Sequence, residues 1–220
     1  MNNSFELLVL LKNAGYLKTT RDPLWWPRSK TFWVIVGAIL TQQSKWEKVE
    51  QSLANLENRG INSLEELACI EEAIVCECIK PSGFYNTKSK NLKRLALAIC
   101  EEFGSFDIFC EQVSREWLLE QTGIGQESAD SILCYACGRE AMVVDAYSAR
   151  LLEAFGYEFD SYEALQSWMC EGIEMHWHKI VALYGRELSL NELYARFHGK
   201  IVEFCKENSR GKIVSVECLG

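Results

Sequence analysis

The sequence predicts an all-α protein, and three features of the chain favour this fold class over a sheet-based one. Only three prolines occur and none follows Pro81, so most of the chain lacks the residue that breaks helices most strongly. Apolar residues recur at helical spacing. Signals for helix ends recur as well: Ser63 and Ser189 each precede a glutamate by three residues, and Gly15 and Gly60 follow periodic apolar segments.

These signals predict the elements in order along the chain. In the long helix over 88–103, Leu92, Leu95, Leu97 and Ile99 are expected to form one apolar face. The alternating residues 212–218 predict a short strand. The predicted helices span residues 4–14, 31–43, 45–58, 64–69, 71–78, 88–103, 105–112, 114–121, 126–138, 146–155, 161–171, 174–185 and 190–207.

Length and composition exclude several protein classes. With 220 residues, 48% of them hydrophobic, the chain can bury the core of one large domain or two small lobes. The apolar run over 32–40 is too short for a bilayer span of about 20 residues, and the N-terminus lacks the basic region of a signal peptide. We therefore expect a soluble, cytoplasmic protein with no membrane partner.

Ten cysteines occur in a chain that is too long for a disulfide-stapled miniprotein. No pair of C-x2-C motifs stands at zinc-like spacing. We expect reduced, mostly buried thiols and no metal site.

The charge pattern allows two interpretations. A net charge of −8 argues against a protein that coats DNA unspecifically. Residues 80–94, however, contain five basic residues and no acid. This segment is either an ordinary solvated helix face or a local basic surface.

The most specific signal is the glycine turn Gly123-Ile124-Gly125 between two predicted helices. Glycine allows positive φ and close backbone approach, and the amides at the start of the second helix can bind an anion such as a DNA phosphate. Ile124, Gln126 and Ser128 are then candidate DNA contacts along with both glycines. The alternative is an ordinary helical hairpin with a glycine turn.

Asp145 follows the apolar triplet Met142-Val-Val and opens an amphipathic helix. An aspartate at this position is a common helix N-cap. It can also be a partly desolvated carboxylate that the helix N-terminus keeps ionised. Both interpretations can hold at once.

Together these segments resemble the helix-hairpin-helix DNA glycosylases. Residues 122–129 match the family's hairpin, and Val143-Val144-Asp145 match the Val-Asp pair that follows it. Residues 37–43 resemble the early helix whose last polar residue enters the duplex, and residues 79–88 resemble the loop before a basic helix. Four further segments are similar to the type III 3-methyladenine DNA glycosylases: 25–27, 84–86, 133–137 and 193–200.

The resemblance implies a fold of two helical lobes with the helix-hairpin-helix motif and an active-site cleft between the lobes. Residues 30–140 would form a middle lobe, and residues 1–29 with 141–220 would form the second. In this fold Asp145 is the catalytic residue, which stabilises the oxocarbenium-like sugar or orients the attacking water. Either Gln42 or Gln43 would fill the gap left by a flipped base, and Lys88 in the basic segment would grip the backbone.

The resemblance also implies a pocket for a cationic damaged base, because stacked indoles attract a cationic ring. The candidate pocket residues are Trp25, Trp26, Trp46, Glu127 and Lys206.

Two departures from the wider family bear on the chemistry. Glu127 stands where bifunctional relatives have a lysine, so no Schiff base with the sugar is expected. The C-terminal region offers only Cys205 and Cys218, so we expect no iron–sulfur cluster and no other cofactor. A monovalent cation at the hairpin is left open.

The sequence therefore predicts a monofunctional DNA glycosylase that acts as a monomer on double-stranded DNA. Its substrate would be an alkylated purine, with 3-methyladenine the leading candidate. Two alternatives stay open: a bifunctional endonuclease III-like glycosylase, and a non-enzymatic helix-hairpin-helix DNA-binding protein.

Overall fold

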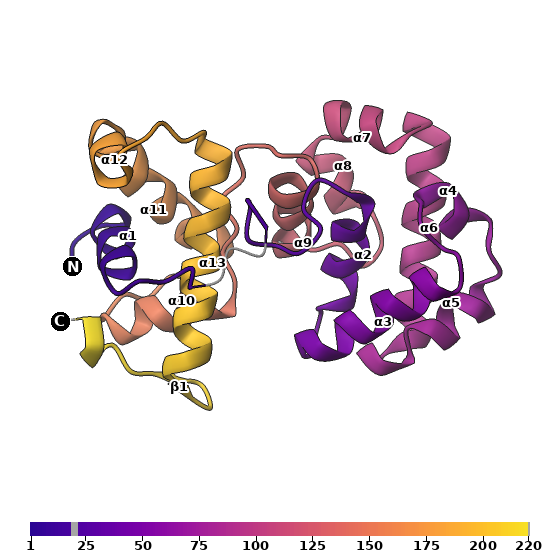
Figure 1. Cartoon of the computed structure of the whole chain (residues 1–220), viewed down its shortest axis with the longest axis horizontal. Coiled ribbons are helices and arrows are strands. Elements are labelled where there is room, and N and C mark those ends of the chain that lie inside the picture. The colour runs from indigo at the N-terminus through magenta and orange to yellow at the C-terminus, as the bar shows by residue number, and fades with distance from the viewer. Residues whose placement is uncertain (19–21, 220) are drawn as a thin grey trace. The chain divides into compact units, whose positions relative to one another are not determined.

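A computed structural model describes residues 1–18 and 22–219 and shows a structure built almost entirely from helices, which confirms the predicted fold class (Figure 1). The α-helices are α1 (Ser4–Asn13), α2 (Phe32–Leu40), α3 (Trp46–Asn58), α4 (Leu64–Cys69), α5 (Glu72–Cys78), α6 (Tyr85–Phe103), α7 (Phe106–Gln112), α8 (Arg115–Glu120), α9 (Gln126–Ser131), α10 (Ala146–Ala154), α11 (Tyr162–Met175), α12 (Trp177–Tyr184) and α13 (Leu190–Asn208). Shorter elements are the 3-10 turns η1 (Lys80–Ser82) and η3 (Glu217–Leu219), the π-helical η2 (Ile132–Ala136), and the paired strands β1 (Ser209–Arg210) and β2 (Ile213–Val214).

The chain divides into two compact units. The terminal unit contains Met1–Pro27 and Arg139–Gly220, and the middle unit contains Arg28–Gly138. Within the described residues, no helix is long and apolar enough to cross a membrane.

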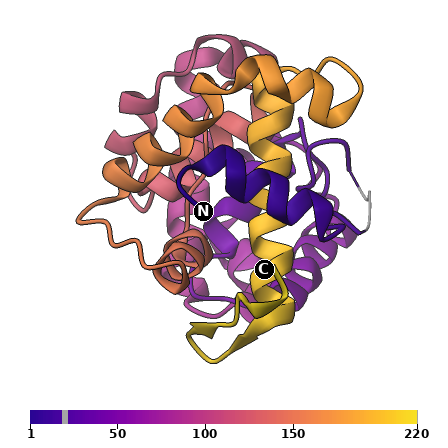
Figure 2. The ribbon, with the colours of Figure 1, turned by 90° about the vertical axis from the view of Figure 1, so that its left-hand side faces the viewer.

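In the terminal unit the long helix α13 is the central element. It packs against α1 and α10, and α1 also packs against α11; Figure 2 shows α1 crossing α13. The packing buries Leu7 and Leu11 of α1 with Phe197, Ile201 and Phe204 of α13 in one apolar core. The two ends of the chain are thus joined in one core.

In the middle unit the central element is α2, whose nine residues are all buried. A helix that is apolar on every side must be covered on every side. Here the covering elements include α3, α6, α9 and η2.

The predicted helix ends are confirmed where local capping sets them. The Oγ atoms of Ser63 and Ser189 each accept the backbone N–H three residues later, at 3.1 Å. Gly15 and Gly60 both have φ of +81°, as glycine at a helix C-terminus requires.

Three local predictions were wrong. Helix α6 begins at Tyr85, so its first turn takes up residues expected to be loop. Leu97 is 42% exposed, because helical rotation places it away from buried Leu92, Leu95 and Ile99. Strand β2 covers only Ile213–Val214 of the expected 212–218, and residues 217–219 form η3 instead.

The thiols also differ from expectation. All ten cysteines are free, but only Cys78, Cys134 and Cys205 are buried. Cys69 and Cys218 are exposed.

Helix α13 carries a polar stripe that holds the N-terminal segment of the same unit. Lys200 is 4% exposed, and its Nζ donates to the carbonyl of Tyr16 at 2.6 Å. Burial, with a smaller contribution from Arg196, lowers the pKa of Lys200 to about 8, whereas Glu203 acts in the opposite direction. The Lys12 ammonium, from α1, also lowers it.

This pKa makes stability depend on pH. Between about pH 8 and pH 10.5 the folded protein binds fewer protons at Lys200 than the unfolded chain, so the free energy of unfolding should rise with pH there. The difference of 10.5 − 8 predicts a rise on the order of 3 kcal/mol relative to Lys200→Met, which cannot titrate. Urea unfolding of the wild type and of Lys200→Met between about pH 8 and pH 10.5 measures this rise in the free energy of unfolding. Lys206→Met, which removes an exposed amine from the same helix, is the matched control. A wild-type-minus-Lys200→Met difference that is independent of pH would contradict the assignment.

Candidate active site and nucleic-acid interface

Asp145 in the terminal unit caps the N-terminus of α10, as its sequence position predicts. One carboxylate oxygen, Oδ1, accepts the backbone N–H of Ser148 at 2.8 Å and the Ser148 hydroxyl at 3.0 Å. Buried Val143 and Val144 precede it, and they fix the entry of the chain into the helix. Both hydrogen bonds to Ser148 are thus accepted by Oδ1, whereas Oδ2 faces a different side chain.

That partner is His198 on α13, which sequence reasoning missed as a functional residue. Its Nε2 lies 3.4 Å from Oδ2 of Asp145, and the two side chains are 5% and 12% exposed. With a proton on Nε2, the imidazole stabilises the carboxylate. Burial alone would raise the pKa of Asp145, but His198 and the two bonds from Ser148 outweigh it, and the pKa lies below its usual value. The site thus holds an ionised, nearly dry carboxylate.

Trp25 lies against the same histidine. The Trp25 and His198 rings meet edge to face with centroids 5.4 Å apart, and Trp25 is half-buried. Trp26 is buried and contacts Trp25 edge to face at 6.3 Å. Of the predicted pocket residues, the structure therefore groups Trp25 and Trp26, and Trp25 connects this pair to His198, the partner of Asp145.

The remaining pocket candidates stand on other elements. Lys206 is exposed on α13, eight residues after His198 and thus about 12 Å farther along the helix. Trp46 is the first residue of α3, and Glu127 lies exposed in the first turn of α9, both in the middle unit.

The glycine hairpin joins α8 to α9 in the middle unit, and its two glycines differ. Gly123 has φ of +87°, and a Cβ there would lie 2.1 Å from Nδ2 of Asn91, so the fold itself requires glycine. Gly125 has extended backbone, φ −97°, and a Cβ there would meet nothing within 4 Å. The expectation of positive φ thus holds only for Gly123. The open space at Gly125 leaves the helix N-terminus accessible to an approaching anion.

Buried side chains hold the hairpin in place. Ile124 at the turn is 6% exposed. Arg115 of α8 donates two hydrogen bonds to the buried carboxylate of Asp130 of α9, at 2.8 and 3.1 Å. This bidentate pair links the two helices rigidly.

The two neighbouring glutamines that follow α2 differ in their contacts and exposure. Nε2 of Gln42 donates to the carbonyl of Gly123 at 2.9 Å and to Oγ of Ser128 at 3.1 Å. Gln42 is thus bound to the hairpin. Gln43 is exposed and has φ of +52°. Of the two, Gln43 is the side chain presented to solvent.

Lys88 requires a correction. It was expected to contact DNA, but it is 4% exposed, and its Nζ donates to the carbonyls of Leu40 and Ser82, both at 2.9 Å. Burial lowers its pKa. A buried ammonium that joins the end of α2 to η1 does not reach a phosphate. Lys80, Lys90 and Arg94 of the same basic segment are exposed.

Phe84 is a further candidate for contact with nucleic acid, and sequence reasoning did not single it out. It is 66% exposed, has φ of +47° and stands at the start of α6 within the basic segment. The signal was an aromatic residue directly after Gly83 in a segment rich in basic residues. An exposed aromatic ring beside basic residues suits contact with nucleic-acid bases.

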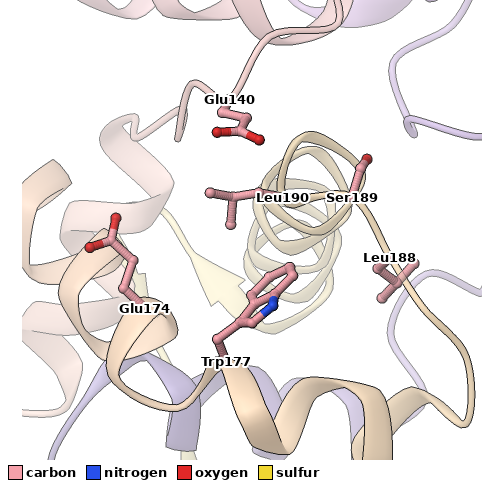
Figure 3. Close-up of a pocket in the computed structure, with 6 residues that line it drawn as sticks. All are labelled: Glu140, Glu174, Trp177, Leu188, Ser189 and Leu190. Atoms are coloured by element: carbon pink, nitrogen blue, oxygen red, sulfur yellow. The ribbon is translucent and has the colours of Figure 1, made fainter.

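A separate open pocket of about 420 Å³ lies within the terminal unit (Figure 3). Two carboxylates and an indole line it, together with two leucines and a serine, and neither Asp145 nor His198 takes part. Its acidic lining disfavours phosphate. The lining residues are Glu140, Glu174, Trp177, Leu188, Ser189 and Leu190.

Among the described residues no group of three or more histidine, cysteine, aspartate or glutamate side chains is arranged to hold a metal ion.

Comparisons with known proteins identify the family of the chain. A family model described as HhH-GPD superfamily base excision DNA repair protein matches residues 36–175. The chain is 33% identical over 229 residues to a protein of Methanocaldococcus jannaschii provisionally named a DNA repair glycosylase, an alignment that covers 98% of this chain and 94% of that one.

Solved structures share the fold. The structure of Helicobacter pylori 3-methyladenine DNA glycosylase bound to 1,N6-ethenoadenine matches with a TM-score of 0.90 and 46% identity, over 94% of this chain and 99% of that one. An endonuclease III in a non-covalent DNA complex matches with a TM-score of 0.72 and 15% identity, over 96% of this chain and 89% of that one, a likeness of fold alone. The chain therefore belongs to the HhH-GPD superfamily of base excision DNA repair proteins and is a DNA glycosylase.

Proposed function

We propose that this glycosylase is monofunctional and hydrolyses the N-glycosidic bond of alkylated purines, 3-methyladenine above all. The observation that carries the proposal is the buried carboxylate of Asp145, which is bonded to Ser148 and faces His198, the histidine against which the Trp25 indole packs. A fixed negative charge is what a positively charged sugar needs as the base leaves.

The chemistry fits an alkylated purine. A purine methylated at N3 carries a positive charge in DNA, so it leaves as a neutral base without a strong general acid. The bond between C1′ and the ring nitrogen breaks, a water oxygen bonds to C1′, and the water gives up a proton. Asp145 stabilises the cationic sugar through Oδ2 or orients that water, since Oδ1 is already bonded to Ser148.

Base recognition follows from the same charge. A cationic ring gains attraction from a stacked indole, and Trp25 is the candidate that packs against His198, the partner of Asp145. The name of the H. pylori relative, a 3-methyladenine DNA glycosylase, supports this substrate class.

DNA binding is assigned to the middle unit. Backbone amides at the start of α9 bind one phosphate, with Gly125 leaving room for its approach. Gln43 and Phe84, both exposed, enter the duplex where the base has been flipped out. Lys80, Lys90 and Arg94 contribute positive charge along the backbone.

The experiment that tests the activity is base release from methylated duplex DNA, with the products separated by chromatography. The wild type should release 3-methyladenine. Asp145→Asn keeps the side-chain size but removes the charge, so release should fall by at least about 10²-fold. Affinity for duplex DNA should stay near that of the wild type. Excision by Asp145→Asn at the wild-type rate would show that this carboxylate is not catalytic.

Strand cleavage tests the monofunctional assignment. Glu127 occupies the position of the lysine of bifunctional relatives, and a carboxylate cannot form an imine with the sugar. The wild type should therefore leave an abasic strand that breaks only after alkali or heat, with no adduct trapped by borohydride. Glu127→Lys is expected to give weak, trappable lyase activity. Nicking by the wild type without alkali would mean that the enzyme is bifunctional.

A further inference from the structure

Trp25 is held in a conformation that it would not adopt alone. Its φ of +74° lies in the left-handed region, which is unfavourable for a bulky side chain. It is nevertheless half-buried and makes defined ring contacts with Trp26 and His198. Such a conformation persists only where neighbouring groups hold it.

One of these groups is Glu203 on α13. Its Oε1 accepts the indole Nε1–H of Trp25 at 3.3 Å. Its Oε2 accepts the backbone N–H groups of Leu17 and Lys18, each at 3.1 Å. One carboxylate thus binds both the backbone at Leu17 and Lys18 and the indole of Trp25.

Another is Gly199, one helical turn before Glu203. A Cβ at Gly199 would lie 2.4 Å from Cγ and 2.7 Å from Cδ1 and Cδ2 of Trp25. The indole therefore rests directly on the α13 backbone. Arg196 contributes a hydrogen bond from Nη1 to the carbonyl of Pro23, at 3.3 Å.

The position of the ring matters because of what lies beside it. Trp25 contacts His198, and His198 contacts the Asp145 carboxylate. An indole whose N–H donates to a carboxylate also has a more electron-rich ring, which attracts a cation more strongly.

We infer that Glu203 and Gly199 are positioning residues for Trp25, and that through it they set the preference for cationic over neutral damaged bases. Gly199 fixes where the ring lies, and Glu203 fixes its orientation and strengthens its attraction for positive charge. The selectivity part of this inference rests on the proposed function. The positioning part does not.

Selectivity is tested by single-turnover excision of 3-methyladenine, which is cationic in DNA, and of 1,N6-ethenoadenine, which is neutral. Glu203→Gln should lower the ratio of the 3-methyladenine rate to the 1,N6-ethenoadenine rate on the order of tenfold, mainly because 3-methyladenine is released more slowly. The matched control is Glu207→Gln, one turn later, because Glu207 binds Lys18 and Tyr16 but not Trp25. Equal ratios in the two variants would overturn the role of Glu203.

A double-mutant cycle tests the route through Trp25. Gly199→Ala should slow excision of both bases in the wild-type background, since the new methyl displaces the indole. In a Trp25→Ala background the same change should have no effect. Additive losses would show that Gly199 acts on the fold and not through Trp25.

A readout that needs no activity separates this inference from the proposed function. In protein labelled with 5-fluorotryptophan, the ¹⁹F resonance of Trp25 can be assigned with Trp25→Phe. It should shift in Glu203→Gln and Gly199→Ala and stay in place in Glu207→Gln. An unmoved resonance in the first two variants would overturn the positioning roles. If the resonance shifts but the wild type releases neither base, the proposed function fails and the positioning roles stand.

Discussion

A carboxylate that must stay ionised in a nearly dry site needs donors that are in place before any substrate arrives, and Asp145 meets this requirement through the start of α10. Oδ1 takes two hydrogen bonds from Ser148, so the helix cap and the candidate catalytic group are the same side chain. Oδ2 then faces His198 on α13. The fold of the terminal unit and its proposed chemistry therefore depend on one set of contacts.

In the middle unit the two glycines of the hairpin meet different requirements. Gly123 is required by the fold itself, since both its φ and its contact with Asn91 exclude a side chain. Gly125 meets no such restriction. A glycine that the fold tolerates but does not demand suits a surface to which another molecule comes close. Gln42 joins this surface to the loop that presents Gln43.

Local signals predicted much of this. The helix positions, the cap at Asp145 and the glycine hairpin all depend on residues within a few positions of one another, which a sequence displays directly. His198 and Glu203 could not be found in the same way, because their partners Asp145 and Trp25 are distant in the chain. In the sequence they are only polar positions on an amphipathic helix.

Lys88 shows the opposite error. Its place in a basic run predicted an exposed charge, yet two carbonyl groups from other parts of the middle unit bind its ammonium inside the fold. Charge pattern alone cannot reveal acceptors that only tertiary packing brings near. Leu97 failed for a simpler reason, since helical rotation turns it away from its apolar neighbours.

The order of the two units along the chain has a consequence for biosynthesis. The middle unit, Arg28–Gly138, is continuous, so it can fold while later residues are still on the ribosome. The core of the terminal unit is complete only when α13 has been synthesised, because α1 packs against α13 in that core. A chain interrupted before Asp145 would carry the hairpin without the carboxylate. Such a fragment would hold the proposed DNA contacts of the middle unit but not the proposed catalytic group, so it would release no base.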